Sequence, residues 1–168
     1  MAAAFITEKF EKLNSYLFKF RFNLFPAFRA SGGKIIFVSH DYKEIHTVFQ
    51  LKRTTKNYHG TGFGGAIYSS MDPIYPMQLI FLLGSEYVVR DKSATIDYIK
   101  PVTQNVYAKF EMPDAVINEI KEQINANGKY IITLPVEYVD KEQTNIYAKA
   151  TKTIYIASRE YYNSRKKR

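Results

Sequence analysis

The sequence contains no cysteine, and its only histidines are His40, His46 and His59. The lack of cysteine excludes disulfides, thiolate catalysis and zinc sites with cysteine ligands. Three histidines are too few for a histidine-rich metal site, so we expect no metal centre. A chain without cysteine also fits the cytoplasm, which is the location that we expect.

No stretch of 18 uncharged apolar residues occurs, so no membrane-spanning helix is predicted. Charged residues at positions 8, 9, 11 and 12 interrupt the apolar N-terminal region, and we expect no secretory signal there. We find no internal repeat, low-complexity segment or recognised nucleic-acid motif. What is present is 168 residues with 46% hydrophobic and 24% charged side chains, which suits one globular domain with a hydrophobic core.

Positive charge is in excess, with a formal net charge of +8. Such a surface attracts phosphorylated cofactors, anionic lipid or nucleic acid. Five basic residues lie in the last ten, and we expect residues 159–168 to be a solvated, frayed tail. Salt-sensitive nucleic-acid binding by this tail is the alternative, but the missing motif leads us to expect no nucleic-acid partner.

The N-terminal part, residues 1–29, is predicted to contain an amphipathic helix over 5–22, followed by the aromatic-rich turn Phe22–Phe28. These pieces are expected to cover a sheet edge or the mouth of a pocket. A helix lying on a membrane surface is the alternative, but its glutamates argue against it, and we expect no membrane insertion.

Beyond this part, alternating apolar residues predict a series of strands. The strands are expected over 34–40, 44–53, 94–100, 106–112, 130–138 and 146–156, with a further strand beginning in 86–89. The first two form a plausible hairpin, Asp140–Glu142 reads as a turn, and Pro135 indicates a sheet edge or a bulge. An amphipathic helix is predicted over 113–127.

The longest apolar segment, residues 66–83, predicts a helix that is buried on all sides, with Pro73 placing a bend at Asp72. Short links between the strands favour an antiparallel sheet, and a wholly apolar helix needs that sheet curled around it. We therefore predict an α+β fold, with about six strands in a curved antiparallel sheet wrapped round a central helix.

A glycine-rich loop precedes this helix, with four glycines between positions 60 and 65. A loop of this kind opening onto a helix leaves backbone N–H groups unpaired at the positive end of the helix dipole, where an oxyanion or phosphate binds. Asp72 lies seven residues after Gly65 and is a carboxylate in otherwise apolar surroundings. We therefore expect the functional site within residues 57–72.

This region resembles the hot-dog fold thioesterases, most closely the phenylacetyl-CoA-type branch and its relatives of unassigned function. Those enzymes carry Asn-x-His-x-x-x-His-Gly-Gly and, seven residues later, an Asp in the central helix. The matching positions here are Asn57, His59, Phe63, Gly64, Gly65 and Asp72. The stretch Thr95–Pro101 is similar to the strand after the helix in that branch, and the resemblance covers roughly residues 30–157, which predicts a hot-dog domain over 30–158.

The resemblance implies hydrolysis of an acyl-CoA thioester, with Asp72 as general base or nucleophile and the Gly65 N–H polarising the carbonyl. It implies that Asn57 positions water or the thioester and that His59 assists or only shapes the loop. Substrate contacts are expected from Phe63, Gly64 and Ser69, and contacts with the coenzyme A phosphates from Lys56, Arg90 and Lys92. Coenzyme A enters as part of the substrate, so we expect no separate cofactor.

The resemblance also implies a homodimer or homotetramer, because the loop of one subunit meets the helical carboxylate of another. Two departures leave alternatives open. Phe63 stands where the family has a histidine, and Pro73 follows Asp72 directly. The protein is therefore either an enzyme with a changed substrate or rate, or a non-catalytic binder of acyl-CoA or lipid. In simpler interpretations Asp72 only caps the segment after Pro73, and Ser69 is a small packing residue.

Overall fold

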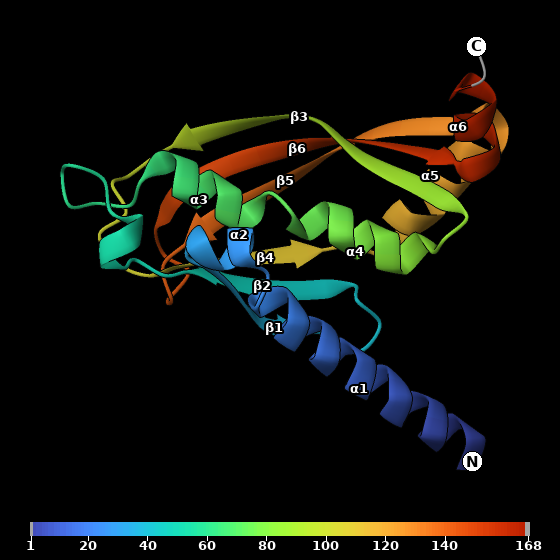
Figure 1. Cartoon of the computed structure of the whole chain (residues 1–168), viewed down its shortest axis with the longest axis horizontal. Helices are drawn as coiled ribbons and strands as arrows, with labels where there is room; N and C mark the ends of the chain where they lie inside the picture. Colours follow the sequence, from blue (N-terminus) through green and yellow to red (C-terminus); the bar gives the residue numbers. More distant parts are fainter. Residues whose placement is uncertain (1, 167–168) are drawn as a thin grey trace.

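A computed structural model describes the backbone of residues 2–166 and the side chains of residues 13–165 (Figure 1). The helices are α1 (Ala2–Asn23), α2 (Pro26–Ala30), α3 (Gly64–Met71), α4 (Ile74–Leu83), α5 (Asp114–Asn127) and α6 (Arg159–Lys166), with a 3-10 turn η1 (Arg53–Thr55). The strands are β1 (Gly33–Val38), β2 (Glu44–Phe49), β3 (Tyr87–Tyr98), β4 (Val106–Glu111), β5 (Lys129–Val139) and β6 (Ile146–Ser158).

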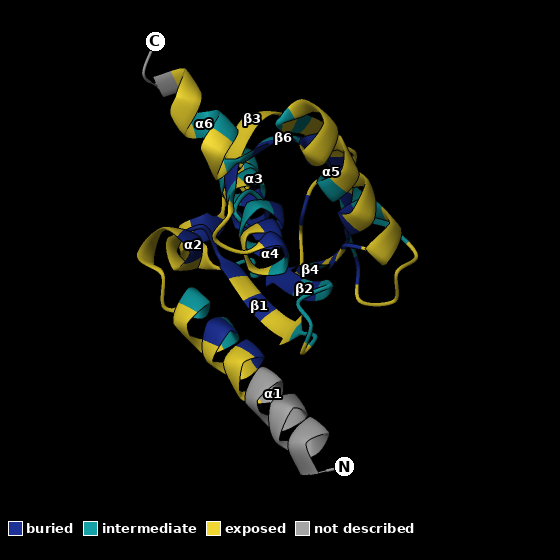
Figure 2. Ribbon diagram, turned by 90° about the vertical axis from the view of Figure 1, so that its right-hand side faces the viewer, coloured by how far each residue is buried: buried dark blue, intermediate teal, exposed yellow. Residues whose placement is uncertain are grey.

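The six strands form one antiparallel sheet in the order β1-β2-β4-β5-β6-β3. The sheet curves around α3 and α4, which lie end to end in its concave side (Figures 1 and 2). The inner faces of the strands and the inner sides of these two helices form the hydrophobic core, in which Leu79, Phe110 and Ile154 are fully buried. The predicted six-stranded curved sheet, and the β1–β2 hairpin within it, are confirmed.

The predicted central helix over 66–83 is confirmed, but it is divided into two helices at the predicted bend. Helix α3 already begins at Gly64 and ends at Met71, and α4 starts anew at Ile74. The predicted interruption at Asp72 is confirmed, since Pro73 lacks the N–H that would continue the helix. Pro76 lies in the first turn of α4, where backbone N–H groups have no intrahelical acceptor and a proline costs little.

Strand β3 also differs, because the segments expected as separate strands over 86–89 and 94–100 form one twelve-residue strand. It pairs with β6 along its whole length, with a bulge between Asp91 and Ser93. The extra residue at the bulge shifts the alternation of buried and exposed side chains, so the two halves look unrelated in sequence. Pro135 is predicted to lie at a sheet edge or a bulge, but β5 is an interior strand of the sheet. Pro135 pairs with Thr151 of β6, and on its other side the pairing of β4 with β5 is confined to Tyr107 and Val139, so that side needs no N–H from the proline.

Helix α1 covers the outer edge of β1, one of the two positions expected for it. The side-chain amide of Asn23 donates to the carbonyl oxygen of Ile35 at 2.9 Å, and its oxygen accepts from the Ile35 N–H at 2.7 Å. This side chain therefore satisfies the edge as a neighbouring strand would. Within the described part of the chain, no helix has the length and apolar character needed to cross a membrane.

The segment expected to be a frayed tail is helical as far as the structure describes it. Arg159–Lys166 form α6, which follows β6 directly. The helix packs a tyrosine against the turn between α5 and β5, since a Cβ on Gly128 would lie 2.3 Å from the ring of Tyr161. Gly128 has a φ of +73°, which closes α5 in the left-handed conformation that glycine favours.

Candidate functional site

The loop before α3 is organised by the side chain of Asn57. Its amide oxygen accepts from the backbone N–H groups of His59 at 2.9 Å and Thr61 at 3.1 Å, and its amide nitrogen donates to the Thr61 hydroxyl at 2.9 Å. Gly60 makes the turn with a φ of +80°. Asn57 therefore holds the loop with both ends of its amide, as asparagine does in Asx turns.

His59 is exposed at this loop, and its ring lies 5.5 Å from the ring of Tyr58. Neither His59 nor Asn57 lines the groove described below. Within a single chain their visible contribution is the loop geometry, and a catalytic role for either stays a prediction.

The start of α3 presents backbone donors, as the glycines predict. Phe63 is the N-cap and provides no side-chain hydrogen bond. The first amide bonded back into the helix is that of Ile67, which donates to the Phe63 carbonyl at 3.0 Å. The amides of Gly64, Gly65 and Ala66 precede this bond and lie at the positive end of the helix dipole. They are the donors available for an oxyanion.

Two aromatic rings lie against these glycines. A Cβ built on Gly65 would lie 2.8 Å from the Phe63 ring, and one on Gly64 would lie 2.9 Å from the Tyr98 ring. The glycines therefore let both rings close over the helix start. The Phe63 ring, at the position where the resembled enzymes have a histidine, lies beside Gly65, whose N–H is the expected oxyanion donor. The Phe63 side chain is itself exposed.

A groove of about 580 Å³ runs along the outer face of α3. Gly65, Ser69 and Asp72 line it at spacings of four and three residues, which place them on one face of the helix. Phe63 lines the same groove, and Phe25 and Phe28 from the N-terminal part form its other side. The structure thus brings together four of the predicted site residues. The Ser69 hydroxyl donates to the Gly65 carbonyl at 2.7 Å, as expected for a residue that only packs on its own helix.

Asp72 is not in apolar surroundings, so that expectation is wrong. Its Oδ1 accepts from the Lys152 Nζ at 2.5 Å and from the Tyr68 hydroxyl at 2.7 Å. Lys152 also pairs with the Asp91 carboxylate at 2.9 Å, and its side chain is only 1% exposed, whereas those of Asp72 and Asp91 are 38% and 42% exposed. A buried cation therefore joins two carboxylates that reach water.

These contacts shift the pKa values of the cluster. Burial alone lowers the pKa of Lys152, but its hydrogen bonds to Asp72 and Asp91 outweigh burial and raise the pKa to about 12. Burial and the bond to Asp72 both raise the pKa of the Tyr68 hydroxyl. At neutral pH Lys152 is therefore charged and Tyr68 is a donor.

Sequence reasoning missed Lys152, although the strand pattern contains a signal. The inward-facing positions of β6 include Ala148, Ala150, Ile154 and Ile156, and Lys152 occupies the same phase. A lysine at a core position is almost always paired with an acid. The identity of the acid is set by the curvature of the sheet and is not visible in the sequence.

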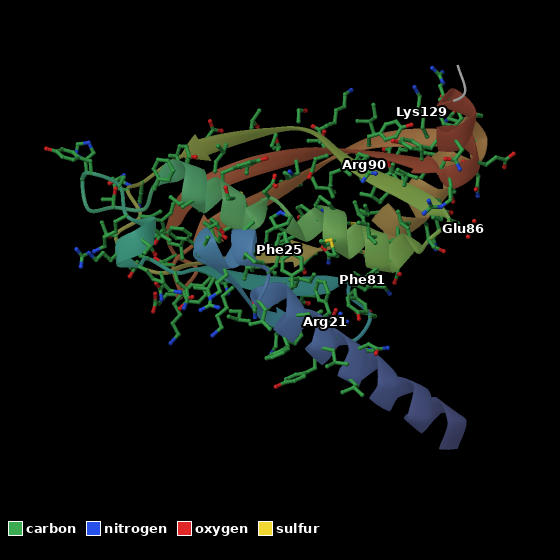
Figure 3. The ribbon with its side chains drawn as sticks, in the orientation of Figure 1. Arg21, Phe25, Phe81, Glu86, Arg90 and Lys129 are labelled. Carbon is green, nitrogen blue, oxygen red and sulfur yellow. The ribbon has the colours of Figure 1, made fainter. Side chains whose placement is uncertain are left out.

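The predicted phosphate contacts do not line the groove. Arg90 lines a separate cavity of about 550 Å³ between β3 and α4, together with Phe81 and Arg159. Arg90 and Phe81 are labelled in Figure 3. Lys92 is exposed at the β3 bulge, and Lys56 is exposed beside its bridge to Gly62. Among the described residues, no group of three or more His, Asp or Glu is placed to hold a metal ion.

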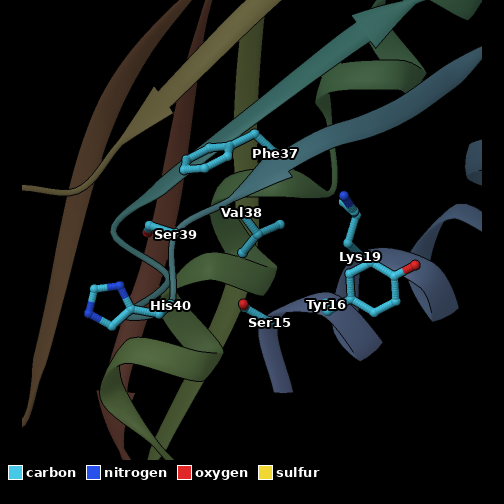
Figure 4. Close-up of a pocket in the computed structure, with 7 residues that line it drawn as sticks. All are labelled: Ser15, Tyr16, Lys19, Phe37, Val38, Ser39 and His40. Carbon is cyan, nitrogen blue, oxygen red and sulfur yellow. The ribbon is translucent and has the colours of Figure 1, made fainter. Parts of the chain in front are cut away.

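A further hollow of about 320 Å³ lies between α1 and the end of β1 (Figure 4). Tyr16 and Lys19 border it from α1, and Phe37 and His40 border it from the hairpin. It shares no lining residue with the groove along α3. We take the α3 groove as the candidate site because Gly65, Ser69 and Asp72 line it, whereas none of the predicted site residues lines this hollow.

A family model described as "Domain of unknown function (DUF4442)" matches residues 14–156. A comparison with curated proteins found no match.

Solved structures with the same fold were found. A Pseudomonas aeruginosa protein named as of unknown function and "Probable Thioesterase" has a TM-score of 0.68 at 13% identity, over 77% of this chain and 85% of that one. A Chlorobaculum tepidum protein of unknown function has a TM-score of 0.68 at 16% identity, over 88% and 94%. The Haemophilus influenzae thioesterase has a TM-score of 0.61 at 13% identity, over 82% and 87%. The hot-dog fold expected from the resemblance is confirmed.

Proposed function

The chain belongs to the DUF4442 family, and we propose that within it this protein is an acyl-CoA thioesterase. The observation that carries the proposal is the groove along α3, in which the first helical amides and the Asp72 carboxylate are presented on one face. The names of two structural neighbours as thioesterases support the same reaction class.

In the proposed reaction a water oxygen attacks the thioester carbonyl carbon while its proton passes to the Asp72 carboxylate. The carbonyl electron pair moves to the oxygen, where the Gly65 N–H stabilises the developing negative charge. Collapse of this intermediate breaks the carbon–sulfur bond, and the proton returns to the coenzyme A thiolate. The products are a carboxylic acid and coenzyme A.

The spacing of the two groups favours a site completed by a second copy of the chain. Gly65 and Asp72 are seven residues apart, which is about 10 Å along the helix axis. Reacting groups need to lie about 3 Å from one carbonyl. A two-fold axis that sets two α3 helices antiparallel pairs Gly65 of each copy with Asp72 of the other, and gives two equal sites. Strand β3 ends the sheet and offers its free edge for such an assembly.

The second candidate is a non-catalytic acyl-CoA or lipid binder. The observation that favours it is the Phe63 ring, which lies against Gly65 where the family has a histidine. Phenylalanine offers no polar group to the reaction. This candidate predicts binding of acyl-CoA without turnover.

Thiol release from short, medium and aromatic acyl-CoAs tests the two candidates. We expect Asp72→Asn to lower turnover by about 10²- to 10⁴-fold, the usual contribution of a general base. Asp91→Asn is the matched control, because it also removes a carboxylate partner of Lys152 and lies outside the groove. We expect Gly65→Ala to lower turnover as well, because its Cβ would displace the Phe63 ring.

Equal activity of the Asp72→Asn and Asp91→Asn variants would contradict the role of Asp72. If no acyl-CoA is turned over while coenzyme A or acyl-CoA still raises the melting temperature, the enzyme proposal fails and the binder remains.

A further inference from the structure

We propose that a second groove, between α1 and α4, binds the acyl chain of the substrate over about its first ten carbons. This inference rests on the proposed function and names its substrate class. The groove has a volume of about 740 Å³. Leu17, Phe18 and Phe22 line it from α1, and Met77 and Phe81 line it from α4.

The α1–α4 groove continues the candidate site. Phe25 and Pro73 line both it and the α3 groove, and Pro73 directly follows Asp72. A chain attached to a carbonyl beside Asp72 therefore passes Pro73 and enters the space under α1. Figure 3 shows Phe25 and Phe81 toward the two ends of this path, with Arg21 beside it on α1.

The length of the groove sets the chain length. Pro73, Met77 and Phe81 follow one another at four-residue spacing on one face of α4, which spans about 12 Å. An extended alkyl chain advances about 1.25 Å per carbon, given carbon–carbon bonds of about 1.5 Å. About ten carbons therefore reach from the carbonyl end to Phe81.

The groove wall is mostly apolar, with Asn14 and Arg21 as its polar members on α1. The rings of Tyr42 and Phe81 are stacked with centroids 4.8 Å apart, and Phe18 meets Phe81 edge-on at 4.8 Å. Leu17, Phe25 and Phe81 remain exposed, although a monomer ordinarily buries apolar groups that adjoin one another. A narrow alkyl chain covers these side chains without moving the rings behind them.

The test is a chain-length series of straight-chain acyl-CoAs from butanoyl to hexadecanoyl. Each buried methylene contributes up to about fourfold. We therefore expect kcat/KM to rise about two- to fourfold per carbon, and by about 50-fold or more over the six carbons from butanoyl- to decanoyl-CoA. We expect a plateau beyond about ten carbons.

Leu17→Trp fills the groove at an exposed position on α1, and we expect it to lower the decanoyl-to-butanoyl ratio at least tenfold. Leu13→Trp is the matched control, since Leu13 lies one turn earlier on the same helix, is exposed and does not line the groove. We expect this control to keep the wild-type profile.

A flat chain-length profile, or the same profile in both tryptophan variants, would overturn the inference. If Leu17→Trp instead breaks an oligomer, measured by light scattering, and leaves the profile intact, a second copy of the chain occupies the groove.

Calorimetric binding of decanoate separates this inference from the proposed function. Binding that Leu17→Trp weakens and Leu13→Trp does not supports the groove even if no thioester is hydrolysed, and absence of decanoate binding to the wild type counts against it.

Discussion

Lys152 offers the most direct test of how this fold holds its candidate site. Its ammonium is buried between the carboxylates of Asp72 and Asp91, at 2.5 and 2.9 Å. The substitution Lys152→Met keeps an unbranched side chain, one heavy atom shorter, and removes the charge. The change in unfolding free energy should therefore reflect the loss of the ion pairs more than a loss of packing.

The expected loss follows from the pKa of Lys152. Its pKa is about 12 in the folded chain, against an ordinary value of 10.5. A difference of this size corresponds to about 2 kcal/mol of stabilisation of the charged form. Removing one partner of a buried pair costs about 3–5 kcal/mol when the other stays buried. Because water reaches both carboxylates here, we expect Lys152→Met to cost about 2 kcal/mol of unfolding free energy. A loss of this size lowers the melting temperature of a chain of this length by about 4–8 °C.

The dependence on pH has a defined sign. A lysine whose folded pKa is raised contributes its full stabilisation below the unfolded pKa, and loses it as the pH rises through the folded pKa. The difference between wild type and Lys152→Met should therefore be constant at neutral pH and narrow between pH 10.5 and about 12.

Urea and thermal unfolding measure this difference, and a neighbouring lysine provides the control. Lys149 lies on the same strand and pairs with Glu137 at 2.9 Å, with side chains 49% and 43% exposed. An exposed pair of this kind contributes about 0–1 kcal/mol, so Lys149→Met should be nearly neutral. Equal stability of the two methionine variants, or a gain from Lys152→Met, would refute the argument that the buried pair stabilises the fold.

Two further predictions concern buried and edge contacts. The Ser70 hydroxyl is fully buried and lies 2.7 Å from the Tyr138 hydroxyl, so Ser70→Ala should cost about 1–2 kcal/mol in urea unfolding, whereas Ser69→Ala on the exposed side of the same helix should cost less than about 0.5 kcal/mol. Similar costs for the two would contradict this. Asn23→Ala leaves the Ile35 edge groups without their partner, so we expect concentration-dependent association by light scattering, and a variant that stays monodisperse to the same degree as wild type would argue against edge protection.

The parts of the fold that sequence predicted are those governed by local patterns. The interruption at Asp72 follows from Pro73 alone, and the hairpin follows from alternation and a turn. The glycine loop indicated backbone donors because glycine chemistry acts within a few residues. These features need no knowledge of which elements meet in space.

The features that sequence did not predict arise where distant segments meet. The bulge after Asp91 changes which side chains of β3 face the core. The alternation of apolar and polar residues that would mark one continuous strand is therefore interrupted at this point. Lys152 reaches Asp72 across 80 positions. The groove under α1 likewise depends on how α1 docks beside α4, which the aromatic-rich sequence suggested only as the cover of an edge or a pocket mouth.

The geometry of Asp72 reconciles its ion pair with the proposed reaction. Both hydrogen bonds to the carboxylate, from Lys152 and Tyr68, end on Oδ1. Among the described residues none donates to Oδ2, and the side chain lines the α3 groove. Lys152 therefore holds one oxygen and fixes the carboxylate in place, while the other oxygen remains for a water. A base held in this way is oriented by its neighbours toward the groove.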